Sequence, residues 1–105
     1  MIRKRMLISV LSLLVSAGMI CSVNAWAYKG EQLAKQAKIN LQQAQHIALT
    51  AFPGKIIDEE LEKEAGGSGL RYSFDIRRGK QLHEVGVDAS DGKILENSDD
   101  SNDKD

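Results

Sequence analysis

Acidic residues near the C-terminal end of this sequence have a spacing that could bind a cation. In the stretch "VGVDASDGKILE", Asp88 and Asp91 lie three residues apart and are followed by Gly92. A helix-loop-helix calcium site needs oxygen ligands at alternate positions and a bidentate glutamate at the twelfth. Counted from Asp88, a glycine stands at the fifth position and Asp99 at the twelfth, and no helix is expected on either side. The stretch instead predicts a tight turn between two strands, because Asp-Gly is a strong hairpin signal.

The other candidates for chemistry do not form a catalytic group. The run "DEELEKE" (Asp58–Glu64) alternates between the two faces of a strand, and we interpret its charges as protection of a sheet edge against aggregation. His46 is expected on the polar face of a helix, and His83 on a strand whose next residue, an acid, points to the opposite face. Ser68 and Ser73 lack a neighbouring base that would activate a hydroxyl. We therefore expect no catalytic residue, no metal site and no cofactor, and we predict that the protein is not an enzyme.

The first element that must position these residues is a helix that begins after Asn40. Asn40 is a good N-cap, and Gln43 three residues later completes a capping-box pattern. Pro53 and Gly54 end the helix, because proline disfavours helical backbone in the residue before it. Apolar residues recur at spacings of three and four and so share one face; they are Leu41, Ala44, Ile47, Ala48, Ala51 and Phe52. A single apolar stripe predicts that the helix lies on a sheet.

Short segments with alternating apolar residues follow the helix and predict strands. The segment "LRYSFDIRR" alternates throughout, "LHEVGVDA" alternates from His83, "GKIIDEELEKE" places Ile57 and Leu61 on one face, and "GKILE" predicts a short fourth strand. The linkers are too short for a parallel crossover. We expect an α+β fold, with one N-terminal helix packed on a small antiparallel sheet of three to four strands. The expected core is Leu41, Ala44, Ile47, Ala48, Phe52, Ile57, Leu61, Leu70, Tyr72, Phe74, Ile76, Val85, Val87 and Ile94.

The first 27 residues have the composition of a secretory leader. The opening "MIRKR" is basic, Met6–Ile20 is an uncharged run rich in Leu, Ile and Val, and "SVNAWA" ends in an A-x-A arrangement. We expect residues 1–27 to be a signal peptide cleaved after Ala27, with cleavage after Ala25 as the close alternative. Lipidation at Cys21 and retention as an uncleaved anchor are two further alternatives. In each case the domain is exported, and we expect a periplasmic or secreted protein.

Removal of the leader would leave an acidic domain without cysteine. The leader carries three of the 14 basic residues and none of the 15 acidic ones, as well as the only cysteine. A net negative domain argues against nucleic acid and anionic membranes as partners, and a chain without cysteine forms no disulfide. Residues 28–38 read as a polar lead-in with helical tendency. Residues 97–105 contain no apolar residue, so we expect a disordered acidic tail.

The order of these elements resembles the PepSY domain family over residues 39–96. The features that carry the resemblance are Ile39, Ala44, Ala48, Pro53-Gly54, Leu61, Tyr72–Ile76, Val87-Asp88-Ala89 and Gly92–Leu95. Asp91 departs from the threonine that is usual in the turn, and Phe74 from a smaller β-branched residue. The family implies a helix packed on an antiparallel sheet and has no catalytic residues. It occurs in propeptides of secreted metallopeptidases and in exported or membrane-attached bacterial proteins.

The resemblance implies a non-catalytic module that binds a protein and inhibits or regulates a secreted or envelope peptidase. The alternative is a periplasmic ligand- or ion-binding or sensing protein with no link to a peptidase. We expect no stable membrane insertion after cleavage of the leader, and the oligomeric state stays open. A partner would bind the free sheet face or the short last strand; the residues expected there are Arg71, Ser73, Asp75, Arg77, Ile94 and Leu95.

Overall fold

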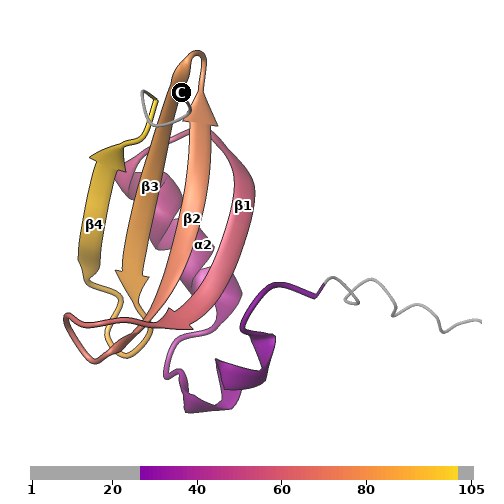
Figure 1. Ribbon diagram of the computed structural model, residues 1–105, viewed down its shortest axis with the longest axis vertical. Helices are drawn as coiled ribbons and strands as arrows, with labels where there is room; N and C mark the ends of the chain where they lie inside the picture. Colours follow the sequence, from indigo (N-terminus) through magenta and orange to yellow (C-terminus); the bar gives the residue numbers. More distant parts are fainter. Residues whose placement is uncertain (1–26, 102–105) are drawn as a thin grey trace, which may run out of the picture.

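The computed structural model describes residues 27–101 as an antiparallel sheet with a helix across one face (Figure 1). The 3-10 helix η3 (Glu31–Gln36) comes first and is followed by helix α2 (Leu41–Ala51). The sheet consists of β1 (Lys55–Lys63), β2 (Leu70–Arg78), β3 (Gln81–Asp88) and β4 (Ile94–Asp99). These strands lie side by side in chain order, each antiparallel to the next. The predicted α+β fold is confirmed.

Helix α2 begins and ends where the sequence pattern predicts. The Asn40 side chain accepts a hydrogen bond from the Gln43 backbone N–H at 2.8 Å, and the Gln43 side chain accepts one from the Asn40 N–H at 2.8 Å. This reciprocal capping satisfies two N–H groups that would otherwise lack intrahelical partners. Phe52, the residue before Pro53, has already left the helical conformation. Residues close to α2 in the chain therefore determine both of its ends.

The core lies between α2 and the sheet. Ala44 and Ala48 are fully buried, and their small side chains let the helix backbone approach the strands closely. Tyr72 and Phe74 of β2 lie beneath them, and the Tyr72 hydroxyl donates a hydrogen bond to the Ile39 carbonyl at 2.9 Å. The sequence pattern did not predict two of the buried apolar residues: Ala89, which belongs to this core, and Leu82, which is opposite Arg77 and so lies on the other side of the sheet.

The prediction that Ile57 and Ile94 belong to the core is wrong, and both residues lie on edge strands. Ile57 is 43% exposed, because the pairing of β1 with β2 shifts between Ile56 and Asp58 and leaves one extra residue on β1. Such a bulge turns the next side chain to the other face, so Ile56 packs against the core instead. Ile94 is 40% exposed at the start of β4.

The lead-in is attached to the sheet. The Leu61 N–H donates to the Lys29 carbonyl at 2.9 Å, so Lys29 forms an isolated parallel bridge with β1. Gly30 makes this possible: it has a φ of 88°, and a Cβ there would collide with the Leu61 carbonyl oxygen. Leu33 then packs against the core. Residues 28–38 thus form a docked segment containing a 3-10 helix.

The C-terminal boundary lies later than we expected. Strand β4 runs to Asp99, and the Asp100 N–H donates to the Leu82 carbonyl at 2.7 Å. The tail predicted from Asn97 is therefore wrong for its first residues, because main-chain pairing with β3 holds even a polar segment. Residues 102–105 lie outside the described residues, as does the predicted leader except Ala27. Within residues 27–101, no helix is long and apolar enough to cross a membrane.

The predicted turn after β3 is confirmed, and Asp88 organises it. The Gly92 N–H donates to the Asp88 carbonyl at 2.9 Å, and Gly92 has a φ of 80°. The Asp88 carboxylate is 2% exposed and accepts hydrogen bonds from the Ser68 N–H at 2.8 Å, the Ser68 hydroxyl at 2.7 Å and the Ser90 N–H at 2.8 Å. Asp88 therefore joins the β1–β2 loop to the β3–β4 turn.

Candidate partner-binding face

The side of the sheet that faces away from α2 is not covered by another layer of the described chain; we call it the open face (Figure 1). Residues paired across antiparallel strands point to the same side, so the register determines which side chains share this face. Glu60 is opposite Ser73, which is opposite Gly86, which is opposite Glu96. The carboxylates that are at least partly exposed on the open face come from all four strands and from the residue after β4: Asp58, Glu60, Glu62, Asp75, Glu84, Glu96 and Asp100.

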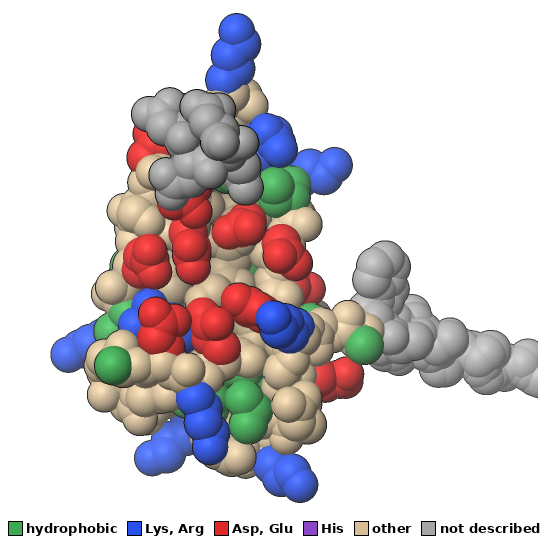
Figure 2. Space-filling view, in the orientation of Figure 1, with side chains coloured by type: hydrophobic (Ala, Val, Ile, Leu, Met, Phe, Trp, Pro, Cys, Tyr) green, Lys and Arg blue, Asp and Glu red, His purple; other side chains and the backbone are tan. Residues whose placement is uncertain are grey.

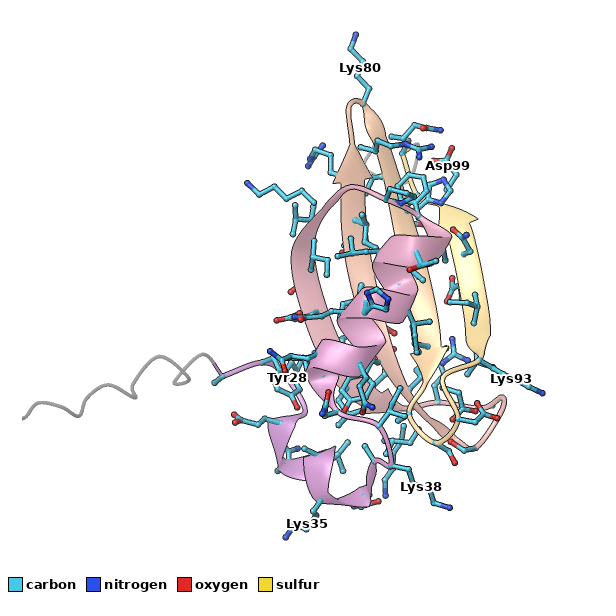
Figure 3. The ribbon with its side chains drawn as sticks, turned by 180° about the vertical axis from the view of Figure 1, so that it is seen from behind. Tyr28, Lys35, Lys38, Lys80, Lys93 and Asp99 are labelled. Carbon is cyan, nitrogen blue, oxygen red and sulfur yellow. The ribbon has the colours of Figure 1, made fainter. Side chains whose placement is uncertain are left out.

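Figure 2 shows this side of the molecule, with acidic side chains gathered over the middle of the sheet. Basic side chains lie mostly toward the ends of the sheet. At one end, Lys55 of β1 lies opposite Arg77 of β2 in the strand register. Seen from the helix side, Lys35, Lys38, Lys80 and Lys93 point outward around the edge of the domain (Figure 3). The charges of the domain are thus separated, with an acidic centre on the open face.

The predicted site residues of β2 do share this face, but two of them are buried. Arg71 is 7% exposed; its Nη1 lies 3.4 Å from Glu96 Oε1, and its Nη2 donates to the Ala65 carbonyl at 3.1 Å. Its Nε has no hydrogen-bond partner among residues 27–101. Ser73 is 5% exposed and donates its hydroxyl to Glu62 Oε2 at 2.8 Å. Arg71 and Ser73 therefore form the floor of the face, and neither projects from it.

The remaining predicted site residues divide between two surfaces. Asp75 is half-buried in the middle of the open face, and Arg77 is exposed toward its end. Ile94 pairs with Val87, whose side chain is buried in the core, so Ile94 lies on the helix side of β4. Leu95 is half-buried at the irregularity in the β3–β4 pairing. The structure does not bring Ile94 together with the residues of β2.

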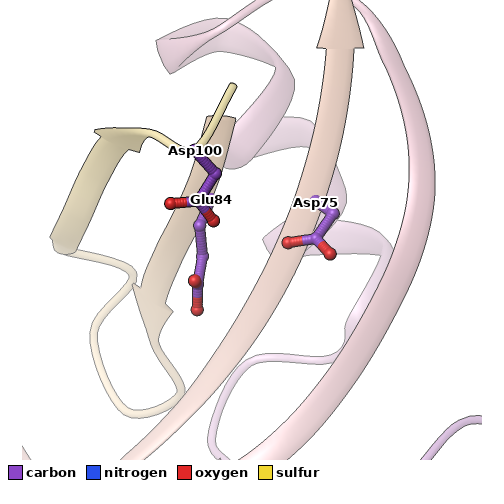
Figure 4. Close-up of side chains that lie close together, drawn as sticks. All are labelled: Asp75, Glu84 and Asp100. Atoms are coloured by element: carbon purple, nitrogen blue, oxygen red, sulfur yellow. The ribbon is translucent and has the colours of Figure 1, made fainter. Parts of the chain in front are cut away.

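Three carboxylates converge at one point of the open face, and the sequence analysis did not identify them as a group. Asp75 of β2, Glu84 of β3 and Asp100 each offer a carboxylate oxygen, and these oxygens lie within 4.8 Å of one another (Figure 4). All three side chains are half-buried. Like charges this close repel each other, so the cluster attracts protons and cations.

Burial, together with repulsion between neighbouring carboxylates, shifts the pKa of Glu84 and Glu60 on this face upward. Burial raises the pKa of Glu84 to about 7, and repulsion from Glu96, Asp100, Asp75 and Glu62 adds to the effect. Burial likewise raises the pKa of Glu60, with repulsion from Glu62, although Lys29 at 3.8 Å opposes this shift. At neutral pH, Glu84 is therefore protonated in about half of the molecules.

Glu84→Gln is expected to stabilise the domain above pH 7. The folded state holds the Glu84 proton up to about pH 7, whereas the unfolded chain releases it near pH 4.3. The contribution of Glu84 to the free energy of unfolding therefore falls as pH rises between these two values and stays low above them. Because Glu84 is partly exposed, we expect a gain on the order of 1 kcal/mol at pH 8. Thermal unfolding at pH 8 and pH 4 measures it.

The same experiment contains its own control. At pH 4 the wild-type carboxyl is protonated in both states, so the variant should have nearly unchanged stability there. Asp91→Asn, which removes a charge from the exposed turn, should leave the pH profile between 4.5 and 7 as it is. A Glu84→Gln variant that is equally stabilised at both pH values would show that ionisation of the Glu84 carboxyl is not the cause.

Both histidines lie away from the open face. The His83 ring stacks on Phe52 with 3.7 Å between centroids, and its Nδ1 lies 2.7 Å from Asn97 Oδ1. The Arg78 guanidinium also lies over the Phe52 ring, 4.4 Å from its centroid. His46 is exposed on α2. These contacts give His83 a packing role. The carboxylates on the open face, by contrast, attract positive charge.

Comparison with known proteins agrees with this fold. The family model described as "peptidase propeptide and YPEB domain", named PepSY, matches residues 38–97, which is more than half of the chain. The match includes α2 and β1 to β3 and most of β4. No curated protein and no solved structure matched the chain. The chain belongs to the PepSY family.

Proposed function

We propose that the protein is an exported, non-catalytic binding module that inhibits or regulates a secreted or envelope peptidase. The observation that supports this most is the family match over residues 38–97, because the family is described by its presence in peptidase propeptides. A propeptide acts by binding the enzyme, and an open sheet face offers a surface for such binding. The basic and apolar N-terminal segment with its A-x-A sequence supports export to the periplasm or beyond.

The second candidate is a periplasmic ion-binding or ion-sensing protein. The convergence of Asp75, Glu84 and Asp100 favours it, since carboxylate oxygens are the ligands that hard cations prefer. Three side chains supply only part of the six to eight oxygens that calcium takes, so waters would have to complete the shell. We therefore rank this function below peptidase regulation and expect no submicromolar calcium affinity.

Recovery of the protein with its partner tests the proposal. The full chain, with its own leader and a C-terminal affinity tag, is expressed in a bacterial host and purified from the periplasmic fraction. We expect an intact mass that corresponds to removal of residues 1–27, and a co-purifying peptidase whose activity falls when more of the protein is added. An unrelated exported domain with the same tag is the control. Enrichment of a partner that is not a peptidase, with no effect on any co-isolated peptidase, would exclude the inhibitor.

A further inference from the structure

The open face concentrates negative charge on one side of the sheet. Two ion pairs lie at this face: Arg71 with Glu96 at 3.4 Å and Lys29 with Glu60 at 3.8 Å. Lys55 and Arg77 lie at one end of the face, away from its centre. The central carboxylates Asp75, Glu84 and Asp100 are half-buried, with oxygens within 4.8 Å of one another; burial, with their repulsion added to it, raises the pKa of Glu84. Repulsion of this kind destabilises the folded state.

Protection against aggregation does not explain this arrangement. Charges that prevent edge-to-edge pairing belong on edge strands, whereas Asp75 and Glu84 lie on the two central strands, β2 and β3. Solubility of an uncovered sheet face needs polar groups, and a mixture of both signs meets that need with less repulsion. A concentration of one sign on one face is instead typical of a surface that attracts an oppositely charged partner.

We propose that the open face docks an extended, lysine- or arginine-rich segment of a protein partner. The occupant follows from charge complementarity, since a basic segment would neutralise carboxylates that now repel one another. The assignment of the segment to a peptidase rests on the proposed function above. Its basic character rests only on the charge of the open face.

The geometry of β1 indicates how such a segment lies. Asp58, Glu60 and Glu62 follow one another at every second residue on the open face, which places them about 6.6 Å apart along a strand. An extended peptide with a basic residue at every second position has the same spacing. Its side chains would reach the β1 carboxylates while Glu84 and Asp75 lie beside it across the sheet. A segment of alternating basic and small residues therefore fits the face best.

A peptide of alternating lysine and serine, Lys-Ser repeated five times, is the probe. Its binding to the protein purified from periplasm is measured by calorimetry at low ionic strength and again with added salt. The face variant carries Glu60→Gln, Glu62→Gln and Glu84→Gln. The control variant carries Glu31→Gln, Asp91→Asn and Asp99→Asn, which lie on η3, on the turn and on the side of His83. Both variants replace three carboxyl groups by amides, so they have equal formal net charge; binding is measured at pH 8, above the pKa of Glu84.

We expect the face variant to bind the peptide about tenfold more weakly than wild type, and the control variant less than about threefold more weakly. Added salt should weaken wild-type binding most, because screening acts on exposed charges. The charge-inverted Glu-Ser peptide should not bind. Folding of both variants is checked by circular dichroism; if the triple variant does not fold, Glu84→Gln alone, which should be stabilised, is expected to show a smaller loss in the same direction.

Four results would overturn this docking surface. Equal weakening of both variants would show attraction by net charge alone, and binding of the Glu-Ser peptide would show that charge does not select the occupant. Saturable binding of calcium chloride that the face variant abolishes, without binding of the Lys-Ser peptide, would make the face a cation site. A face variant that still captures and inhibits a peptidase would exclude this surface while the proposed function holds. Peptide binding without any captured peptidase would support the surface and contradict the proposed function.

Discussion

Replacing Phe74 with alanine is expected to lower the free energy of unfolding by about 3–5 kcal/mol. Phe74 is completely buried in the centre of β2, with its ring 6.4 Å from that of Tyr72 and with Val85 opposite it on β3. The substitution leaves a cavity beneath α2 that so small a core cannot fill by rearrangement. The melting temperature should fall by at least about 12 °C, as measured by circular dichroism.

Ile57→Ala is the matched control for this substitution. Ile57 is apolar and lies in the sheet too, but the bulge in β1 turns it to solvent. Its truncation should cost less than about 1 kcal/mol. If Phe74→Ala and Ile57→Ala lower stability equally, the bulge and the assignment of faces along β1 and β2 are wrong.

Asp88→Ala is the second substitution with a large expected effect, a loss of about 3 kcal/mol. It removes a buried carboxylate that accepts three hydrogen bonds, and the Ser68 and Ser90 N–H groups lose this acceptor. Both loops that Asp88 joins should loosen, so hydrogen exchange at Ser68 and Ser90 should accelerate together. Urea unfolding monitored by circular dichroism measures the loss of stability.

The wild-type protein should also lose stability in acid because of Asp88. Burial alone would raise the pKa of this carboxyl, but the hydrogen bonds from Ser68, Ser90 and Asp91 together outweigh burial and lower it. A lowered pKa in the folded state stabilises the protein above the unfolded value near 3.9, and this contribution disappears as pH falls through the folded value.

Asp88→Asn keeps the shape of the side chain and removes its charge. It should therefore have a weaker dependence of stability on pH below 4 than the wild type has. Asp91→Asn is the control, since Asp91 is exposed and accepts only a local bond from the Lys93 N–H. The role of Asp88 would be contradicted if the stability of Asp88→Asn depended on pH below 4 as strongly as that of the wild type. It would also be contradicted if Asp88→Ala and Asp91→Asn lowered the free energy of unfolding equally.

The elements with strong local signals could be predicted from the sequence. The cap at Asn40, the stop at Pro53 and the alternation of β2 each depend on residues close together in the chain. The bulge in β1 could not be predicted, because Ile56 and Ile57 are chemically equivalent and only pairing with β2 selects the inward one. The extension of β4 beyond Glu96 was missed for a similar reason, since its residues are polar and its hydrogen bonds are to β3.

The open face shows the same limit. Alternation places Arg71, Ser73, Asp75 and Arg77 on one side of β2, which the sequence predicts and the register confirms. The meeting of Asp75, Glu84 and Asp100 depends on the register of separate strands and on a residue that we assigned to a tail. Aligning the predicted hairpins by their turns would have paired Asp75 with Glu84 and revealed part of the cluster.

The bridge between Lys29 and β1 has a consequence for the expected removal of the leader. A processing peptidase binds its substrate in an extended conformation on both sides of the bond that it cuts. If the leader is cut after Ala27, only Tyr28 lies between that bond and Lys29, whose carbonyl is already bonded to Leu61. A domain that had folded first would shield its own cleavage site. If residues 1–27 are a cleaved leader, we therefore expect processing to precede docking of Lys29 on β1.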